Sequence, residues 1–197
     1  NIKERLLEKC QIERTGRFYD GSEILKVATD SNESTAEIYT TDSRCIALEH
    51  IEDSIDAELF IIPTTHRSAA DKRTLSCHTQ GNWGKADLGG TDCNLSVAPS
   101  FYLKRSFMTM SKRCNEMGLD YEPTLEVTHH GPDIERPTIF LEIGSTEAEW
   151  KDRSAAAVIA DVIIDLIGFN PDTDEHAAKW VSAIGIGGPH YCNGFNK

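Results

Sequence analysis

The chain has 197 residues, of which 39% are hydrophobic and 26% charged, and its formal net charge at pH 7 is −12. This length and composition are typical of one soluble domain that buries its own core without disulfide or metal staples. No run of 18 uncharged apolar residues occurs, which excludes an ordinary membrane-spanning helix. The first ten residues, NIKERLLEKC, lack the apolar run of a secretory signal. We therefore expect a cytoplasmic protein.

Cysteine usage gives no sign of a disulfide or zinc framework. No two of the six cysteines lie closer than 16 residues, so no C-x-x-C pair is present. This spacing, without a secretory signal, favours free thiols in a reducing compartment.

The negative net charge argues against general affinity for nucleic acid, but the charges are unevenly distributed. Residues 64–113 hold eight basic and three acidic residues, a local charge of +5, whereas the remainder carries −17. A basic segment in an acidic protein is typical of a face that follows a phosphate backbone. A locally basic helix and loop that bind nothing would give the same pattern. The basic residues are Arg67, Lys72, Arg73, Lys85, Lys104, Arg105, Lys112 and Arg113.

The pattern of apolar residues predicts an α/β protein. Helices are predicted where apolar residues recur at helical spacing, in the last two cases after a capping residue, at 1–9, 99–117 and 146–167. Strands are predicted at 23–28, 36–41, 45–50, 59–64, 74–79, 125–128, 138–144 and 180–186. Pro63 places the fourth of these strands at a sheet edge or marks its end. Strands interleaved with helices predict a single three-layer α/β domain over 1–197, with a mixed, mostly parallel sheet.

Two predicted strands end in residues that carry chemistry. His129 and His130 are followed by Gly131-Pro132, which indicates that the strand has ended, so the two side chains need not point to opposite faces. We expect one to face a site and the other to be structural; two surface histidines at a turn are the alternative. Glu142 is a carboxylate inside an apolar strand, which is costly to bury unless it is paired or bound to a metal. It is the strongest single functional prediction, against the alternative of a solvent-facing glutamate.

Polar groups at two further positions fit an anionic ligand. Ser145 either caps the helix that follows or lies where that helix N-terminus receives a phosphate. Gly187 and Gly188 offer bare N–H groups suited to an oxyanion or a ribose phosphate, and His190 would project into the same space. A tight turn is the alternative, but it explains only the glycines.

The basic segment also contains two histidines after strand-like runs. Histidines beside arginine or lysine are natural contacts to phosphate and ribose. The predicted contacts to such a ligand are His66, Arg67, His78, Lys85, Lys104 and Arg105. Five of the seven histidines thus lie at predicted strand ends, and histidines gathered with a glutamate are what a zinc site needs. No tight ligand spacing demands a metal.

Taken together, six motifs resemble the archaeal and plant-type D-aminoacyl-tRNA deacylases, in order and spacing along essentially the whole chain. They are T-H-R-S at 65–68, H-T-Q-G-N at 78–82, G-K-A-D-L-G-G at 84–90, T-H-H-G-P at 128–132, E-I-G-S-T-E-A-E-W at 142–150 and G-I-G-G-P-H-Y at 185–191.

The resemblance implies an ester hydrolase that releases a D-amino acid from the 3′-terminal ribose of tRNA, including D-aminoacyl-tRNA modified by aldehydes. It implies zinc as cofactor, a tRNA charged with a D-amino acid as partner, a monomer or weak oligomer, and a fold similar to peptidyl-tRNA hydrolase and phosphorylase-like domains. Carried over by motif, the reaction centre is lined by His129, His130, Glu142, Ser145 and His190, with His66 and His78 close by.

A working mechanism follows from the resemblance. A histidine pair that includes His129 and His190 either holds Zn²⁺ or activates water as a general base. Glu142 is a further zinc ligand or orients a histidine, and the amides of Gly187 and Gly188 help to polarise the ester carbonyl.

The chain also departs from the family pattern. Family members begin with a strand before the Asn1-Ile2 pair and continue beyond the last motif, so we expect a chain truncated at both ends. Pro189 stands where the family has glycine or another small residue. Two alternatives stay open: a peptidyl-tRNA hydrolase-like or other metal-assisted ester or amide hydrolase, and a non-catalytic RNA-binding module.

Overall fold

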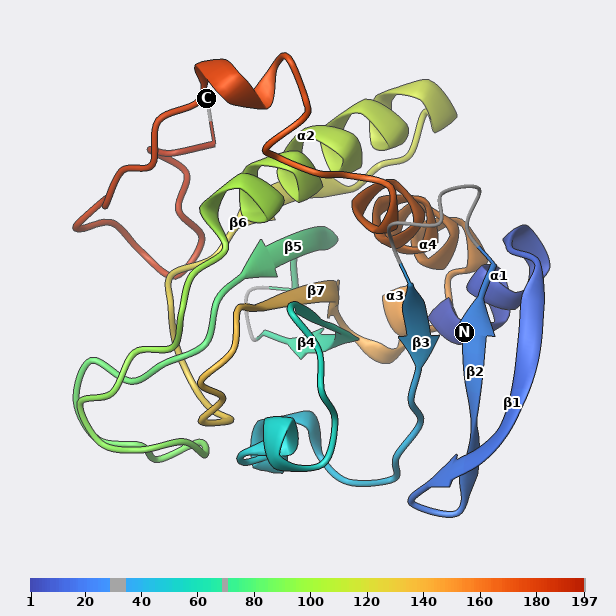
Figure 1. Ribbon diagram of the computed structural model, residues 1–197. Coiled ribbons are helices and arrows are strands. Elements are labelled where there is room, and N and C mark those ends of the chain that lie inside the picture. The colour runs from blue at the N-terminus through green and yellow to red at the C-terminus, as the bar shows by residue number, and fades with distance from the viewer. Residues whose placement is uncertain (29–34, 69–70, 197) are drawn as a thin grey trace.

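The computed structural model describes residues 1–28, 35–68 and 71–196 (Figure 1). The helices are α1 (Ile2–Lys9), α2 (Ser100–Met117), α3 (Glu147–Trp150) and α4 (Arg153–Ile167), with short 3-10 turns η1 (Cys45–Ala47), η2 (Ile51–Asp53) and η3 (Ala177–Lys179). The strands are β1 (Ile12–Tyr19), β2 (Ser22–Val27), β3 (Ala36–Ile38), β4 (Phe60–Arg67), β5 (Thr74–His78), β6 (Glu122–Leu125) and β7 (Thr138–Ser145).

A mixed four-stranded sheet forms the centre of the molecule. Its order is β4-β7-β5-β6, in which β4 pairs with β7 and β5 with β6 in parallel, while β5 and β7 are antiparallel. The predicted α/β class and mostly parallel mixed sheet are confirmed. Pro63 lies within β4, an edge strand, where its missing N–H leaves no ladder bond unmade.

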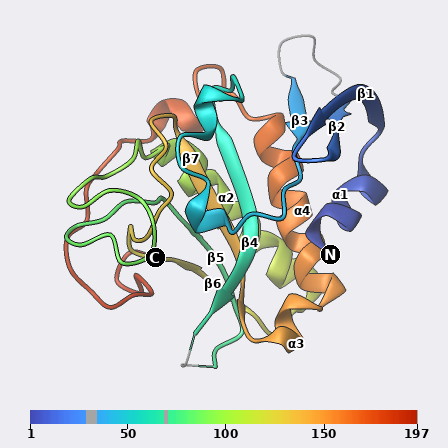
Figure 2. The ribbon, with the colours of Figure 1, turned by 90° about the horizontal axis from the view of Figure 1, so that it is seen from below.

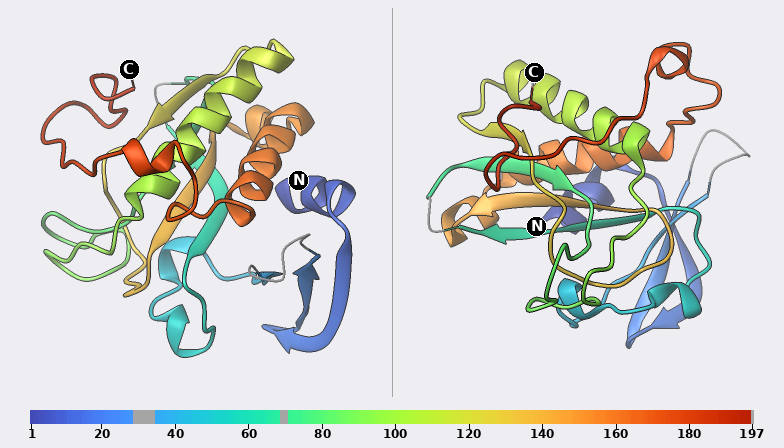
Figure 3. Two further views of the ribbon diagram at one scale, coloured as in Figure 1. Left: turned by 45° about the horizontal axis from the view of Figure 1, so that its top comes forward. Right: turned by 90° about the vertical axis from the view of Figure 1, so that its left-hand side faces the viewer.

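Helices cover one face of this sheet (Figure 1; Figure 3, right). Alternate residues of the central strand β7 point to that side, where Ile139, Leu141 and Ile143 are at most 1% exposed and pack in one cluster with α2 and α4. The side of α4 that faces them is almost entirely aliphatic. Burial of this apolar surface is the main source of stability for the domain.

The opposite face of the sheet is covered by irregular chain instead of helices. Phe60 and Ile62 of β4 pack there with Ile55 and Ile134, which come from the segments after η2 and before β7. A separate antiparallel sheet, β1-β2-β3, stands to one side (Figures 1 and 2). The third layer is therefore built from loops and 3-10 turns.

One predicted helix is divided in the structure, and one strand was not predicted. The predicted helix over 146–167 is split into α3 and α4, because the Asp152 carboxylate accepts the N–H groups of Ser154 and Ala155 and starts a new helix there. The capping box of Thr146 and Glu149 is present as expected at the start of α3. The sequence pattern missed strand β1, whose charged residues and bulge obscure its alternation.

Two predicted strands are wrong. Residues 45–50 form the turn η1 and then a left-handed residue at His50, because the Glu49 carboxylate is drawn to the backbone N–H groups of Gly90 and Asp133. Residues 180–186 have strand-forming side chains but no neighbouring strand in the described structure, and Val181 and Ile186 are each 89% exposed.

Two predictions from composition concern the cysteines and membrane-spanning helices. All six cysteines are free thiols, as expected. Among the described residues, no helix combines the length and hydrophobicity needed to cross a bilayer.

Candidate active site

Polar side chains gather on the sheet face opposite the helices. Because residues alternate along a strand, Phe140, Glu142 and Gly144 of β7 share that face. The register sets His66 of β4 beside Gly144, and His78 of β5 beside Phe140. Glu142 therefore lies between two histidines from different strands. A Cβ at position 144 would lie 2.6 Å from Thr74 Oγ1 and 3.3 Å from the His66 ring, so glycine leaves room for both side chains.

The chain after β6 adds the second group of residues. Glu126, His129 and His130 follow this strand directly, and the His78 ring lies 4.4 Å from His129 and 5.0 Å from His130 between centroids. From the sequence we expected one of these two histidines to face a site and the other to be structural. In the structure both rings lie in the same cluster.

His190 reaches the cluster through the C-terminal segment. An antiparallel bridge joins Tyr191 to Glu126, with the N–H of Val127 donating to the His190 carbonyl at 3.0 Å. The His190 Nε2 atom lies 3.0 Å from Glu126 Oε2, and its ring stacks on His66 with centroids 5.2 Å apart. Three distant stretches of sequence thus meet at one place.

Glu126 is the site residue that sequence reasoning missed. Its side chain is fully buried and lies within 3.7 Å of His66 and His129 and within 3.0 Å of His190. The signal was present, because Glu126 stands between Leu125 and Val127 just as Glu142 stands between apolar residues. The cost of burying an unpaired carboxylate applies equally to both.

Glu142 and His66 form a close carboxylate–imidazole pair. The Nδ1 atom of His66 lies 3.2 Å from Glu142 Oε2, and the Nε2 atom of His78 lies 3.8 Å from the same oxygen. Burial by itself raises the pKa of Glu142, but its contacts with the two histidines outweigh burial and hold that pKa well below its usual range. Burial lowers the pKa of His66, yet the two carboxylates outweigh it, so the pKa of His66 is raised.

Three histidines form a different kind of group. The Nδ1 atoms of His78, His129 and His130 each face a backbone carbonyl, of Thr79, Val127 and Gly131 respectively. A carbonyl oxygen only accepts, so each Nδ1 carries the proton and each Nε2 keeps its lone pair when the ring is neutral. Burial, together with the charge of His78, lowers the pKa of His129 to about 3. The ring of His129 is therefore neutral at pH 7.

The cluster contains donor atoms in arrangements that suit a metal ion. In each of three groups the donor atoms lie within 4.8 Å of one another: His78, His129 and His130; His66, Glu126 and His190; His78, Glu126 and Glu142. Several of these atoms are buried and make no hydrogen bond, including Nε2 of His66 and His78 and both oxygens of Glu126. The combination predicted from the sequence, His129, His190 and Glu142, is not one of these groups; the group that includes Glu142 joins it to His78 and Glu126.

Other predicted site residues lie apart from this cluster. The Ser145 hydroxyl donates to the carbonyl of Lys72, and Thr146, not Ser145, caps the helix that follows. Gly187 and Gly188 have φ angles of +110° and +96°, and both are exposed in the segment before His190. They occupy backbone conformations that glycine adopts freely.

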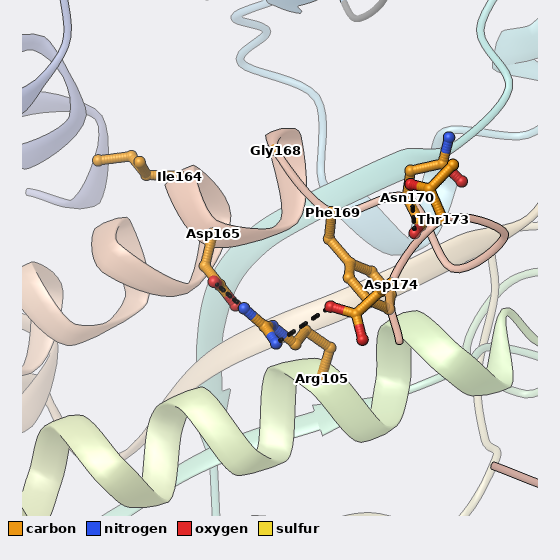
Figure 4. Close-up of a pocket in the computed structure, with 8 residues that line it drawn as sticks. All are labelled: Arg105, Ile164, Asp165, Gly168, Phe169, Asn170, Thr173 and Asp174. Atoms are coloured by element: carbon orange, nitrogen blue, oxygen red, sulfur yellow. Dashed lines mark hydrogen bonds and ion pairs between the residues drawn. The ribbon is translucent and has the colours of Figure 1, made fainter. Parts of the chain in front are cut away.

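Most basic residues of segment 64–113 are paired with acids from elsewhere. Arg105 makes two contacts of 2.6 Å with Asp165 and lies 4.0 Å from Asp174, beside a pocket of about 340 Å³ (Figure 4). In the same way Arg113 contacts Asp161, and Arg73 lies near three carboxylates. Acidic residues of α4 and of neighbouring segments thus neutralise basic residues of α2. The positive charge that segment 64–113 offers to a ligand is therefore smaller than +5. Arg67, Lys85 and Lys104 make no ion pair within the described residues.

The glycine-rich loop at 84–90 packs tightly against the turn at 128–132, which carries His129 and His130. A Cβ at Gly131 would lie 2.3 Å from backbone atoms of both Gly89 and Gly90, which is closer than atoms can approach. This contact fixes His130, the residue before Gly131, against the loop.

We expect Gly131→Ala to lower the free energy of unfolding by about 1–3 kcal/mol, since the backbone of one segment must move. Gly84→Ala is the matched control, because a Cβ there meets nothing within 4 Å. Thermal unfolding of both variants checks this, and equal midpoints would contradict it.

The fold and the cluster define a class: an α/β protein whose sheet carries a buried histidine–carboxylate centre suited to hydrolysis or to holding a metal ion. The sequence model of the D-aminoacyl-tRNA deacylase family matches residues 53–197. The chain belongs to this family.

Curated relatives and one solved structure agree with this assignment. The D-aminoacyl-tRNA deacylase of Archaeoglobus fulgidus is 36% identical over 159 residues, which cover 78% of this chain and 55% of that protein. That of Pyrococcus horikoshii is 33% identical over 198 residues, covering 97% and 68%. A crystal structure described as a conserved protein of unknown function has a TM-score of 0.74 at 33% identity, covering 86% of this chain and 58% of its own. The chain thus spans between about half and two thirds of these proteins.

Proposed function

We propose that this chain hydrolyses the ester bond of D-aminoacyl-tRNA and so takes part in chiral proofreading, as its relatives' name says of them. The observation that carries the proposal is the convergence of His66, Glu126, Glu142 and His190 with three further histidines on one sheet face. Ester hydrolysis needs a base for water and a positive or donating group for the carbonyl oxygen, and this cluster holds candidates for both.

Zinc fits the residues present. His78, His129 and His130 each fix Nδ1 on a backbone carbonyl, which is how proteins commonly orient imidazole for a metal. The low pKa of His129 keeps its ring neutral, the form that binds metal, whereas the contact with Glu142 outweighs burial and raises the pKa of His78, so a metal ion bound there would displace a proton from His78. His66, Glu126 and His190 form a second suitable set. Bound zinc would act as a Lewis acid toward the ester carbonyl and would lower the pKa of a coordinated water.

The His66–Glu142 pair is best suited to move the proton. The Nδ1 atom of His66 lies 3.2 Å from the Glu142 carboxylate, whose charge favours the proton on Nδ1, so the Nε2 atom, which makes no hydrogen bond, is the one that would accept a proton from water. Because Glu142 raises the pKa of His66, this ring is a stronger base than His129. Of the two roles predicted for Glu142, orientation of a histidine is the one that this contact supports.

Substrate recognition would come from the chain around the cluster. Arg67 and Lys85 are exposed and make no ion pair in the described structure, although Arg67 lies over the Trp150 ring, so they can contact phosphates of the acceptor end. The backbone N–H groups of Gly187 and Gly188, in the exposed segment just before Pro189 and His190, make no backbone hydrogen bond with the described residues and could contact the ribose. Steric exclusion of the L side chain would account for chiral selection, since both isomers share the tRNA contacts.

The deciding test is release of tyrosine from matched D-tyrosyl-tRNA and L-tyrosyl-tRNA, with and without a zinc chelator. We expect rapid release of the D isomer only, loss of that release with chelator, and recovery when zinc is added back. Equal release of both isomers would contradict chiral proofreading, and full activity in chelator would contradict a zinc requirement.

One observation favours the alternative hydrolase of a small ester or amide. The pairing of Arg73, Arg105 and Arg113 with acids leaves fewer cations for tRNA than the sequence implied. Competition by uncharged tRNA distinguishes the two, because it inhibits a tRNA-directed enzyme but not a small-ester hydrolase. A non-catalytic RNA-binding module would not account for the two buried carboxylates, Glu126 and Glu142.

A further inference from the structure

An exposed tryptophan stands on the loop next to the candidate active site. Trp83 is 67% exposed, and its indole makes no ring contact or hydrogen bond with any residue that the structure describes. The other two tryptophans are both engaged: Trp150 donates to the His66 carbonyl and Trp180 stacks near Phe101. Tryptophan is enriched at binding surfaces, because its ring offers a large apolar area together with a polar N–H group.

The loop that carries Trp83 is held in one shape. On either side of this residue, the Asn82 N–H donates to Asn94 and the Cys93 N–H donates to Gly84, both at 2.7 Å. The Asn82 side chain is buried and donates to the Gly89 carbonyl at 2.9 Å. The indole is therefore presented on a fixed backbone, which lowers the entropic cost of binding a flat ligand.

The same loop is joined directly to the histidine turn. The Gly81 N–H donates to the His130 carbonyl at 2.8 Å, and the Gly131 N–H donates to the Leu88 carbonyl at 3.0 Å. Trp83 is two residues from Gly81, so their Cα atoms are at most about 7 Å apart. In Figure 1 the loop (green) runs beside the segment that carries the two histidines (yellow).

We propose that Trp83 is the stacking platform for an unpaired base at the 3′ end of the tRNA, next to the ester in the cluster. This proposal rests on the proposed function. Unpaired bases stack on exposed aromatic rings in proteins that bind single strands. Lys85, two residues away, is exposed and unpaired in the described structure, and supplies a charge for the adjoining phosphate. The loop backbone is hydrogen-bonded to the turn that carries His130, which favours this occupant over a second copy of the chain.

The test is binding of uncharged tRNA, intact or trimmed of its three 3′-terminal nucleotides. Stacking of one base contributes about 1–3 kcal/mol, so we expect Trp83→Ala to weaken binding of intact tRNA by roughly 5- to 150-fold. The same variant is expected to bind trimmed tRNA as the unmodified chain does. Trp83→Phe keeps a ring and is expected to retain most of the affinity.

Phe18→Ala is the matched control, because Phe18 is 68% exposed on β1 in the separate sheet. It is expected to change neither affinity. Equal weakening of both tRNAs by Trp83→Ala, or no weakening of either, would overturn the proposal. So would light scattering that shows a dimer which this variant dissociates. The binding assay needs no catalysis, so it separates failure of this proposal from failure to hydrolyse D-tyrosyl-tRNA.

Discussion

Glu142→Gln is expected to lower kcat for D-tyrosyl-tRNA by about 100-fold or more with little change in KM. Glutamine keeps the size of the side chain but removes the negative charge that lies 3.2 Å from Nδ1 of His66. General-base catalysis contributes about 10²–10⁴-fold to a rate, and a histidine that is no longer oriented loses much of it. Single-turnover kinetics with D-tyrosyl-tRNA measures the change.

The pH dependence of kcat/KM in Glu142→Gln distinguishes a role in catalysis from a purely structural role of Glu142. His66 acts as a base only when neutral, and Glu142 raises its pKa, so activity falls as the pH drops below that raised value. Without the carboxylate the pKa of His66 falls, and we expect the acid limb of kcat/KM to shift to lower pH. Glu147→Gln is the control, because Glu147 is an exposed helix residue whose single ion pair with the described residues is to Lys151. An unshifted limb with a near-normal rate would remove Glu142 from the mechanism.

Glu126→Gln is expected to weaken zinc binding by about tenfold or more and to lower the hydrolytic rate with it. The Glu126 carboxylate lies close to His66, His129 and His190, so it is either a ligand or the group that sets their orientation. Loss of a group that orients metal ligands typically costs 10–100-fold in affinity. Competition with a chromophoric chelator measures the zinc affinity directly.

The control for this variant comes from the same strand. Glu122→Gln removes a carboxylate of β6 that is half exposed and, among the residues that the structure describes, forms an ion pair with Lys72 alone, so zinc affinity and rate are expected to stay unchanged. Normal zinc affinity in Glu126→Gln would show that Glu126 neither binds nor orients the metal.

Much of the fold could be predicted from local pattern. The helices α2 and α4 and the strands β4, β5 and β7 carry apolar residues at helical or strand spacing; α2 and the three strands are present within a few residues of their predicted bounds, and α4 ends at its predicted residue. Two predicted strands failed for a tertiary reason. Residues 180–186 have no partner strand, and the Glu49 side chain draws residues 45–50 into turns.

The candidate site was predicted only in part. His129, His130, Glu142 and His190 were identified from strand ends, motifs and the cost of burying a carboxylate, and all lie in one cluster. Glu126 was missed although it carries the same signal as Glu142. The basic segment was overestimated, because the acids that neutralise Arg105 and Arg113 lie some 50 residues away on α4.

The sequence by itself determined the family, the α/β class and the residue types of the centre, because motifs, apolar periodicity and charge are local properties of the chain. Only the tertiary structure decided which groups act together. The register of β4 against β7 sets His66 beside Glu142, and the bridge between Tyr191 and Glu126 brings His190 to them. The register of the strands and the position of the C-terminal segment depend on how distant segments pack. The free energy of that packing is shared among many residues at once.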